Sequence, residues 1–183
     1  MVVDPHGAVV ARGRNRVYDR GSEPGQLSWS LLAHAEVNAL AQLAPEPRYE
    51  DHTLLTALEP CLLCVGAARL ATVGAIRFGG SDPYGGAARL RLSGSNPMLD
   101  RGGFDVTGPE LGPLGALVTI LHADVFLRRR PEGFVVAAYR RSLPALVAAA
   151  EKLQARGVAA RASAGEPFAD VLPDVWDVVA GET

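Results

Sequence analysis

Residues 53–64 read Thr-Leu-Leu-Thr-Ala-Leu-Glu-Pro-Cys-Leu-Leu-Cys, and this stretch decides the fold prediction. Its first six residues form a short apolar run of the kind that makes a buried strand. Pro60 suits a position just before or within the first turn of a helix, and the Ala-rich residues 61–72 are predicted to be helical. The stretch therefore predicts a strand followed closely by a helix whose first turn carries Cys61 and Cys64.

Strands and helices are also predicted on both sides of this stretch. Strands are predicted at 2–4, 8–11, 75–78, 105–107 and 134–139, and helices at 31–43, 114–130 and 142–156. Ser28 or Ser30 is expected to cap the helix that begins at residue 31. Residues 12–26 and 81–103 are rich in Gly and Arg and are predicted to be loops. Strands that alternate with helices indicate an α/β protein built as a three-layer α/β/α sandwich.

The composition narrows the class of protein. The chain has 183 residues, of which 48% are hydrophobic, so it can bury a substantial core and disorder is not expected. Its apolar stretches are shorter than the roughly 20 residues that span a bilayer, and no signal peptide opens it. We therefore expect a cytoplasmic protein without a membrane partner. The formal net charge of −2 argues against a broadly basic nucleic-acid surface, and the arginines at 128–130 are interpreted as a solvated helix end.

The two cysteines are the only ones in the chain, and both follow His34 and Glu36. His34, Cys61 and Cys64 would supply three zinc ligands, and a catalytic zinc leaves its fourth position to water. A glutamate beside such a water can take its proton and pass it to a leaving amine. His-x-Glu followed by Pro-Cys-x-x-Cys is the signature of the zinc deaminases. The pattern therefore predicts a zinc centre with Glu36 as the proton shuttle.

Two other interpretations of the cysteine pair stay open. A Cys-x-x-Cys can be a thioredoxin-like redox pair, although such a pair needs no His-x-Glu upstream. A purely structural zinc would need a fourth protein ligand. The remaining histidines suit that role poorly, because His6 lies in a predicted turn, His52 precedes a strand and His122 falls in an amphipathic helix.

The motifs together resemble the cytidine deaminase-like superfamily. Within it, the chain is most similar to the branch of tRNA adenosine deaminases, guanine deaminases and related nucleobase deaminases. The resemblance covers residues 2 to about 130 and rests on the stretches 34–40 (His-Ala-Glu-Val-Asn-Ala-Leu), 53–64, 76–82, 85–87 and 13–16 (Gly-Arg-Asn-Arg). It implies a mixed sheet of about five strands between helices, one Zn²⁺ per subunit and a homodimer. The domain prediction is a deaminase domain at 1–130 and an extension at 131–183 with one helix that packs on it.

The resemblance also implies roles for single residues. His34, Cys61 and Cys64 would bind zinc, and Glu36 would be catalytic. The residues expected to contact the substrate are Asn15, the backbone N–H groups of Ala35 and Cys61, Asp82 beside the pocket, and Trp29 and Tyr84 as rings that could stack on the base.

Two departures from the family pattern bear on these expectations. The family begins with a helix before its first strand, whereas this chain begins in the strand. Either the helix at 142–156 takes that place or the chain as given starts too late. After Asp82 the chain reads Pro-Tyr-Gly-Gly, where members that act on tRNA carry basic residues. This difference favours a small substrate over tRNA.

The expected function is zinc-dependent hydrolytic deamination, which replaces an exocyclic ring amine by a carbonyl and releases ammonia. A nucleobase or nucleoside, with a purine favoured, is the first expectation for the substrate. The alternatives are a pyrimidine base, nucleoside or nucleotide, an adenosine in tRNA that is converted to inosine, and the riboflavin-pathway deaminases, whose cysteines are further apart. A catalytically silent assembly protein that keeps the zinc fold is the alternative outside enzymes.

Overall fold

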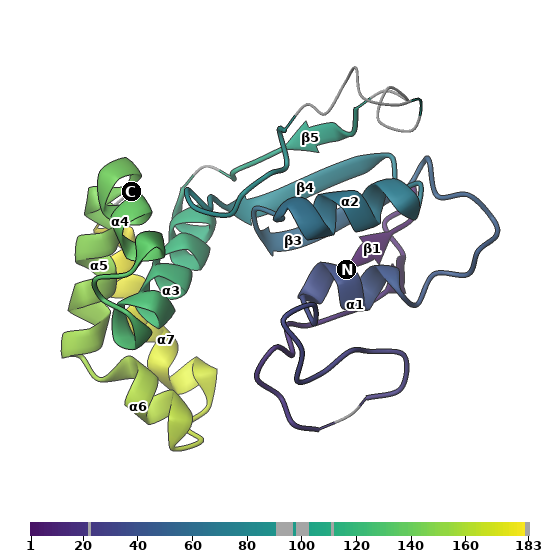
Figure 1. Ribbon diagram of the computed structural model, residues 1–183. Helices are drawn as coiled ribbons and strands as arrows, with labels where there is room; N and C mark the ends of the chain where they lie inside the picture. Colours follow the sequence, from purple (N-terminus) through teal and green to yellow (C-terminus); the bar gives the residue numbers. More distant parts are fainter. Residues whose placement is uncertain (22, 91–96, 98–102, 111, 182–183) are drawn as a thin grey trace. The chain divides into compact units, whose positions relative to one another are not determined.

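A mixed five-stranded sheet runs through the N-terminal part of the computed structural model, which describes residues 1–21, 23–90, 97, 103–110 and 112–181 (Figure 1). Its strands are β1 (Val2–Val3), β2 (Val9–Ala11), β3 (Thr53–Leu58), β4 (Ala75–Gly80) and β5 (Asp105–Thr107), in the order β2-β1-β3-β4-β5. β1 pairs antiparallel with both β2 and β3, whereas β4 and β5 are parallel. The predicted mixed sheet of about five strands is confirmed.

The first two strands form the hairpin that the sequence predicts. Asp4 organises its turn, because its Oδ1 atom accepts hydrogen bonds from the backbone N–H groups of His6 (2.9 Å) and Ala8 (2.8 Å). Gly7 adopts a φ of 85°, which glycine reaches without a steric penalty. The turn brings β2 beside β1, and the other edge of β1 pairs with β3.

Two helices, α1 (Ala35–Leu40) and α2 (Leu62–Leu70), pack against this sheet. Their apolar residues and those of the strands share one buried cluster, which includes Val2, Leu54, Ile76, Phe78, Ala39, Leu40, Val65 and Ala68. Burial of apolar surface contributes about 25 cal/mol per Å² to the stability of the fold. The shared cluster therefore holds both helices against the sheet.

Helix α1 is shorter than predicted, and its predicted serine cap is wrong. His34 precedes the helix in extended backbone (φ −72°, ψ 153°), and Ser30 accepts a hydrogen bond from Leu32 N within a turn. The segment before His34 instead pairs with the preceding loop, because Arg16 N donates to Ala33 O over 2.8 Å. This long-range contact explains the difference, since the apolar periodicity of residues 31–34 gives no sign of it.

The described part of the chain divides into two compact units. The first consists of Met1–Phe78 and Gly85–Gly108, and the second of Gly79–Tyr84 and Pro109–Thr183. The second unit contains α3 (Pro113–Arg129), α4 (Phe134–Ser142), α5 (Pro144–Ala155), α6 (Val158–Ser163) and α7 (Phe168–Ala180). Its buried cluster draws on all five helices and includes Ile120, Leu127, Val136, Tyr139, Val147, Leu153, Val158, Val175 and Val179.

The strand predicted at 134–139 is wrong, because these residues form α4. Val135 and Val136 favour a strand by local preference. However, Val136 and Tyr139 lie one helical turn apart and both enter the helical core. The Tyr139 hydroxyl also lies 2.6 Å from Nδ1 of His122 on α3. Tertiary packing therefore overrides the local preference here.

Residues 131–181 hold four helices, α4 to α7, where the sequence led us to expect one. The predicted helix at 142–156 corresponds to α5, whose buried residues pack within the helical cluster of the second unit. Its placement beside the first strand and the domain boundary at residue 130 stay predictions. The part of the predicted loop 81–103 that is described contains no helix or strand, and 91–96 and 98–102 lie outside the described residues. Among the described helices, none combines the length and apolar character needed to cross a bilayer.

Gly13 provides a test of how closely the N-terminal loop packs on α1. A Cβ atom at this position would overlap the backbone of Ala35, Asn38 and Ala39. We expect Gly13→Ala to lower the free energy of unfolding by about 1–3 kcal/mol, the usual cost of overpacking. Urea unfolding followed by circular dichroism measures this change.

Gly66→Ala is the matched control for that substitution. Gly66 lies within α2, and an added Cβ meets nothing within 4 Å. Alanine is favoured over glycine in a helix by about 1 kcal/mol, so this variant should be as stable as the wild type or more so. Equal destabilisation of the two variants would contradict the close packing of Gly13.

Candidate metal centre

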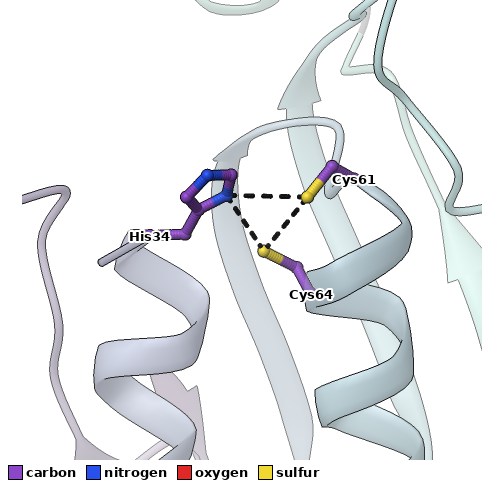
Figure 2. Close-up of side chains that lie close together, drawn as sticks. All are labelled: His34, Cys61 and Cys64. Carbon is purple, nitrogen blue, oxygen red and sulfur yellow. Dashed lines mark hydrogen bonds between the residues drawn. The ribbon is translucent and has the colours of Figure 1, made fainter. Parts of the chain in front are cut away.

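Three side chains from separate parts of the sequence converge at one point in the first unit. Nδ1 of His34 lies 3.5 Å from Sγ of Cys61 and 3.5 Å from Sγ of Cys64, and the two sulfur atoms are 3.6 Å apart. Figure 2 shows the three side chains pointing toward one another. Among the residues that the structure describes, they form the candidate cluster for a metal ion.

The N-terminal ends of α1 and α2 bring these residues together (Figure 2). His34 immediately precedes α1, Cys61 immediately precedes α2, and Cys64 lies in the first turn of α2. Positions three residues apart share a helix face, so both sulfur atoms of the pair point to the same side. Because the N-terminal end of a helix is electropositive, it favours the thiolate forms that bind metal ions.

The spacing of the three donors fits a tetrahedral zinc ion. Zinc binds sulfur at about 2.3 Å and imidazole nitrogen at about 2.0–2.1 Å. Tetrahedral angles then require about 3.8 Å between two sulfurs and about 3.6 Å between sulfur and nitrogen. The observed separations of 3.6 and 3.5 Å agree with these values. The donor set, two thiolates and one imidazole, is also chemically suited to zinc.

Contacts within the protein favour the thiolate form of one of the two cysteines, Cys61. Hydrogen bonds from Cys64 and His34 lower the pKa of Cys61 to about 3. The pKa of Cys64 is raised, because it donates to Cys61 and is buried, and the pKa of His34 is raised by its hydrogen bond with Cys61. Cys61 is therefore a thiolate at neutral pH, and Cys64 must lose its proton when a metal binds.

Glu36 lies beside the cluster, in the first turn of α1. One carboxylate oxygen, Oε2, is 3.3 Å from Sγ of Cys64. The other, Oε1, accepts a hydrogen bond of 2.5 Å from Oγ1 of Thr56 on β3. The sequence identifies Glu36 but not Thr56. Side chains alternate between the two faces of a strand, so Thr56 shares a face with Leu54, which is buried in the core. This alternation was the signal in the sequence that could have identified Thr56.

Asn38 anchors the loop that leads to the cluster and was also missed as a functional residue. It is completely buried on α1. Its amide group accepts a hydrogen bond from Leu27 N (2.7 Å) and donates to Arg14 O and Leu27 O (both 3.1 Å). A buried amide without such partners would be costly. Asn38 therefore fixes the two ends of loop 14–27 on the helix that also carries Glu36.

Arg16 organises the interior of this loop. Arg16 is only 7% exposed and forms ion pairs with Asp19 and Glu23. Its Nε atom donates a hydrogen bond to the side-chain oxygen of Gln26. Its backbone carbonyl accepts a hydrogen bond from Trp29 N over 3.0 Å. The loop is thus held by polar contacts rather than by an apolar core.

Three of the predicted substrate-contacting residues lie on or beside this loop. Ala35 is the first residue of α1, so its N–H group has no partner within the helix. Asn15 is exposed, and its Oδ1 atom accepts a hydrogen bond from Val17 N over 3.1 Å. Trp29 is 54% exposed, and the Arg20 guanidinium lies 4.1 Å from the centre of its ring. Their contacts with a substrate stay predictions.

Asp82 and Tyr84 do not belong to the unit that contains the metal cluster. Both belong to the segment Gly79–Tyr84 of the second unit. Tyr84 is 58% exposed, and its backbone N–H donates to Oδ1 of Asp82 over 3.0 Å. A substrate-binding role for these two residues stays a prediction from the sequence.

Comparison with known proteins identifies the region that carries the cluster. Residues 1–79 match the family model of the cytidine and deoxycytidylate deaminase zinc-binding region. The chain is 37% identical over 133 residues to a tRNA(Ile)-lysidine synthase of Deinococcus radiodurans. It is 32% identical over 91 residues to the tRNA-specific adenosine deaminase subunit tad2 of Schizosaccharomyces pombe. The family match ends at residue 79, before Asp82 and Tyr84.

The matched regions are partial. They cover 69% of this chain and 22% of the Deinococcus protein, and 48% of this chain and 24% of the yeast protein. The chain thus spans about a quarter or less of these curated relatives. A solved chain from a study of A-to-I editing by tRNA:A34 deaminases is 28% identical, with a TM-score of 0.44, and the match covers 58% of this chain and 72% of that chain.

Zinc analysis of purified variants tests the donor set. We expect one zinc per wild-type chain by elemental mass spectrometry. Cys64→Ser should weaken zinc binding at least tenfold in a competition with a chromogenic chelator, because serine supplies no soft thiolate.

His6→Asn is the control, because His6 lies in the turn between β1 and β2 and outside the metal cluster. This variant should keep the wild-type zinc content. If Cys64→Ser bound zinc as tightly as the His6 variant, the donor set would be wrong.

Proposed function

We propose that this chain, whose residues 1–79 match the family model of the cytidine and deoxycytidylate deaminase zinc-binding region, is a hydrolytic deaminase. The reaction replaces an exocyclic ring amine by a carbonyl oxygen taken from water and releases ammonia. One observation carries the proposal, namely that the Glu36 carboxylate lies 3.3 Å from a ligand atom of a three-donor metal cluster. A purely structural zinc needs four protein ligands and no adjacent carboxylate.

In the proposed reaction, three residues bind the metal ion and a fourth transfers protons. His34, Cys61 and Cys64 would hold a zinc ion, which would supply the Lewis acidity that activates a water molecule. Glu36 accepts a proton from the attacking water and transfers it to the ring nitrogen beside the reacting carbon. It then takes the second proton from the hydroxyl group added to the ring carbon and delivers it to the amine, so that the carbonyl forms as the carbon–nitrogen bond breaks and ammonia leaves. Its position at the edge of the metal cluster supports this role.

We propose an adenosine in tRNA as the substrate. The names of both curated relatives refer to tRNA, and one of them is an adenosine deaminase subunit. The loop that precedes His34 presents Arg14, Arg20 and Trp29 at its surface. Cations and an aromatic ring are the groups that contact phosphates and unstacked bases in RNA.

A free purine base or nucleoside is the second candidate. It is favoured by the net charge of −2 and by the Pro-Tyr-Gly-Gly stretch after Asp82, which contains no basic residue. Both candidates require the same chemistry at Glu36 and differ only in what surrounds the ring.

An ammonia-release screen with the zinc-loaded protein tests the proposal and separates the two candidates. Its arms are tRNA, adenosine and guanosine, the free purines, and cytosine and cytidine. We expect release from tRNA, accompanied by inosine in a nuclease digest. Faster turnover of a free purine would support the second candidate, and no release in any arm would contradict the proposed function.

Glu36→Gln is expected to keep one zinc per chain and to lower kcat about 10²–10⁴-fold, the usual contribution of general acid–base catalysis. Glutamine preserves the size of the side chain but cannot carry the proton. Glu50→Gln serves as the control, because it removes an exposed carboxylate that pairs only with Arg48 among the contacts described. A Glu36 variant as active as this control would refute the mechanism.

A homodimer also remains part of the proposal. The resemblance to the deaminase family implies it. Sedimentation equilibrium of the purified chain measures the oligomeric state.

A further inference from the structure

We propose that Thr56 is a positioning residue that holds the Glu36 carboxylate in its working orientation. This inference rests on the proposed function, because it assigns Thr56 a role in the reaction of Glu36. Neither the cysteine pair nor the His-x-Glu pattern identifies Thr56. The inference arises from a contact between two elements that are 20 residues apart in the sequence.

The two oxygens of Glu36 have separate neighbours. Oε1 accepts the 2.5 Å hydrogen bond from the Thr56 hydroxyl, and Oε2 lies 3.3 Å from Sγ of Cys64. The terminal torsion of a glutamate side chain is broad and roughly two-fold. An isolated Glu36 would therefore sample many carboxylate orientations, whereas a partner on Oε1 leaves Oε2 turned toward the metal centre.

Thr56 is a rigid anchor because of its place in β3. Leu54 and Thr56 lie on the same face of the strand, and Leu54 is completely buried in the core below α1 and α2. Branching at Cβ restricts the side-chain rotamers of threonine. The hydroxyl also lies 3.1 Å from the carbonyl oxygen of Leu58 in the same strand. Both oxygens are acceptors for the single hydroxyl proton, and the contact with Glu36 is the shorter of the two.

The contact joins the sheet to the helix that carries the proton shuttle. Glu36 stands on α1, a helix of six residues, and reaches the metal centre through a flexible side chain. A catalytic group must be held within about 0.5 Å of its productive position. Hydrogen-bond partners that orient the ligands of a metal site typically contribute about 10–100-fold to metal affinity or activity, and we expect an effect of the same size for a carboxylate beside such a site. Thr56 meets this requirement because it binds the carboxylate directly and does not belong to the metal cluster.

A positioning role and a merely structural tie between β3 and α1 predict different behaviour. A structural tie would act through stability, and any side chain that filled the space would suffice. A positioning role needs the hydroxyl itself, acts on kcat rather than on KM, and leaves zinc binding unchanged. Thr56→Val replaces the hydroxyl by a methyl group of similar size, and Thr56→Ser keeps the hydroxyl and removes the methyl group.

Steady-state kinetics on the substrate found in the screen separate these roles. We expect Thr56→Val to lower kcat about 10–100-fold with KM and zinc content unchanged within about threefold. Thr56→Ser should recover kcat to within about threefold of the wild type. Thr53→Val, which removes a hydroxyl from the first residue of the same strand, is the matched control and should leave kcat unchanged. A wild-type kcat in Thr56→Val, or a kcat in Thr56→Ser as low as in Thr56→Val, would overturn the proposal.

A second measurement tests Thr56 without using activity. Crystal structures of zinc-loaded wild type and Thr56→Val report the orientation of the carboxylate directly. We expect a single Glu36 orientation bonded to Thr56 in the wild type and two or more orientations in the variant. An unchanged, single orientation in Thr56→Val would refute the anchor. If the wild type deaminated nothing, the proposed function would fail, and the crystal structures would still decide whether Thr56 orients Glu36.

Discussion

The meeting of two helix N-terminal ends is the constraint on which the site depends. His34 and Cys61 each stand immediately before a helix in extended backbone, with ψ angles of 153° and 173°. Both helices are fixed by the same apolar cluster over the sheet, so their first turns cannot move apart without exposing core residues. The apolar core thereby supplies the geometry of a polar centre. Three donors reach separations that suit zinc, although they come from two distant parts of the chain.

Polar contacts carry out the finer adjustment around that centre. Asn38 is fully buried and uses its side-chain amide to hold the loop before His34 against α1. Thr56 performs a similar task for Glu36 from the opposite side, through β3. Hydrogen bonds suit this purpose because they are directional, whereas apolar packing tolerates rotation. Glu36 on α1 is thus held by a residue of β3, and the loop before His34 is held by a residue of α1.

The sequence predicts most of the first unit because its signals there are local. Short apolar runs and turn residues predict the hairpin, β3, α2, β4 and β5. In the second unit, the helical period of the apolar residues predicts α3. The failures occur where distant contacts decide. Residues 31–33 have helical periodicity but lie outside α1, because the backbone N–H of Arg16 donates a hydrogen bond to Ala33 O. Residues 134–139 have strand preference but form a helix, because Val136 and Tyr139 pack into the helical core.

The sequence by itself determined the chemistry of the site. Cys61 and Cys64 are three residues apart at the start of a predicted helix, and His34 and Glu36 are two apart, so the donor types and their order could be read directly. Only the tertiary structure decided how these groups face one another. Alternation along β3 indicates which face Thr56 occupies, but no spacing along the chain encodes its contact with Glu36 on α1. The physical reason is that a ligand set depends on residue type, whereas the orientation of a carboxylate depends on whatever side chain the fold places against it.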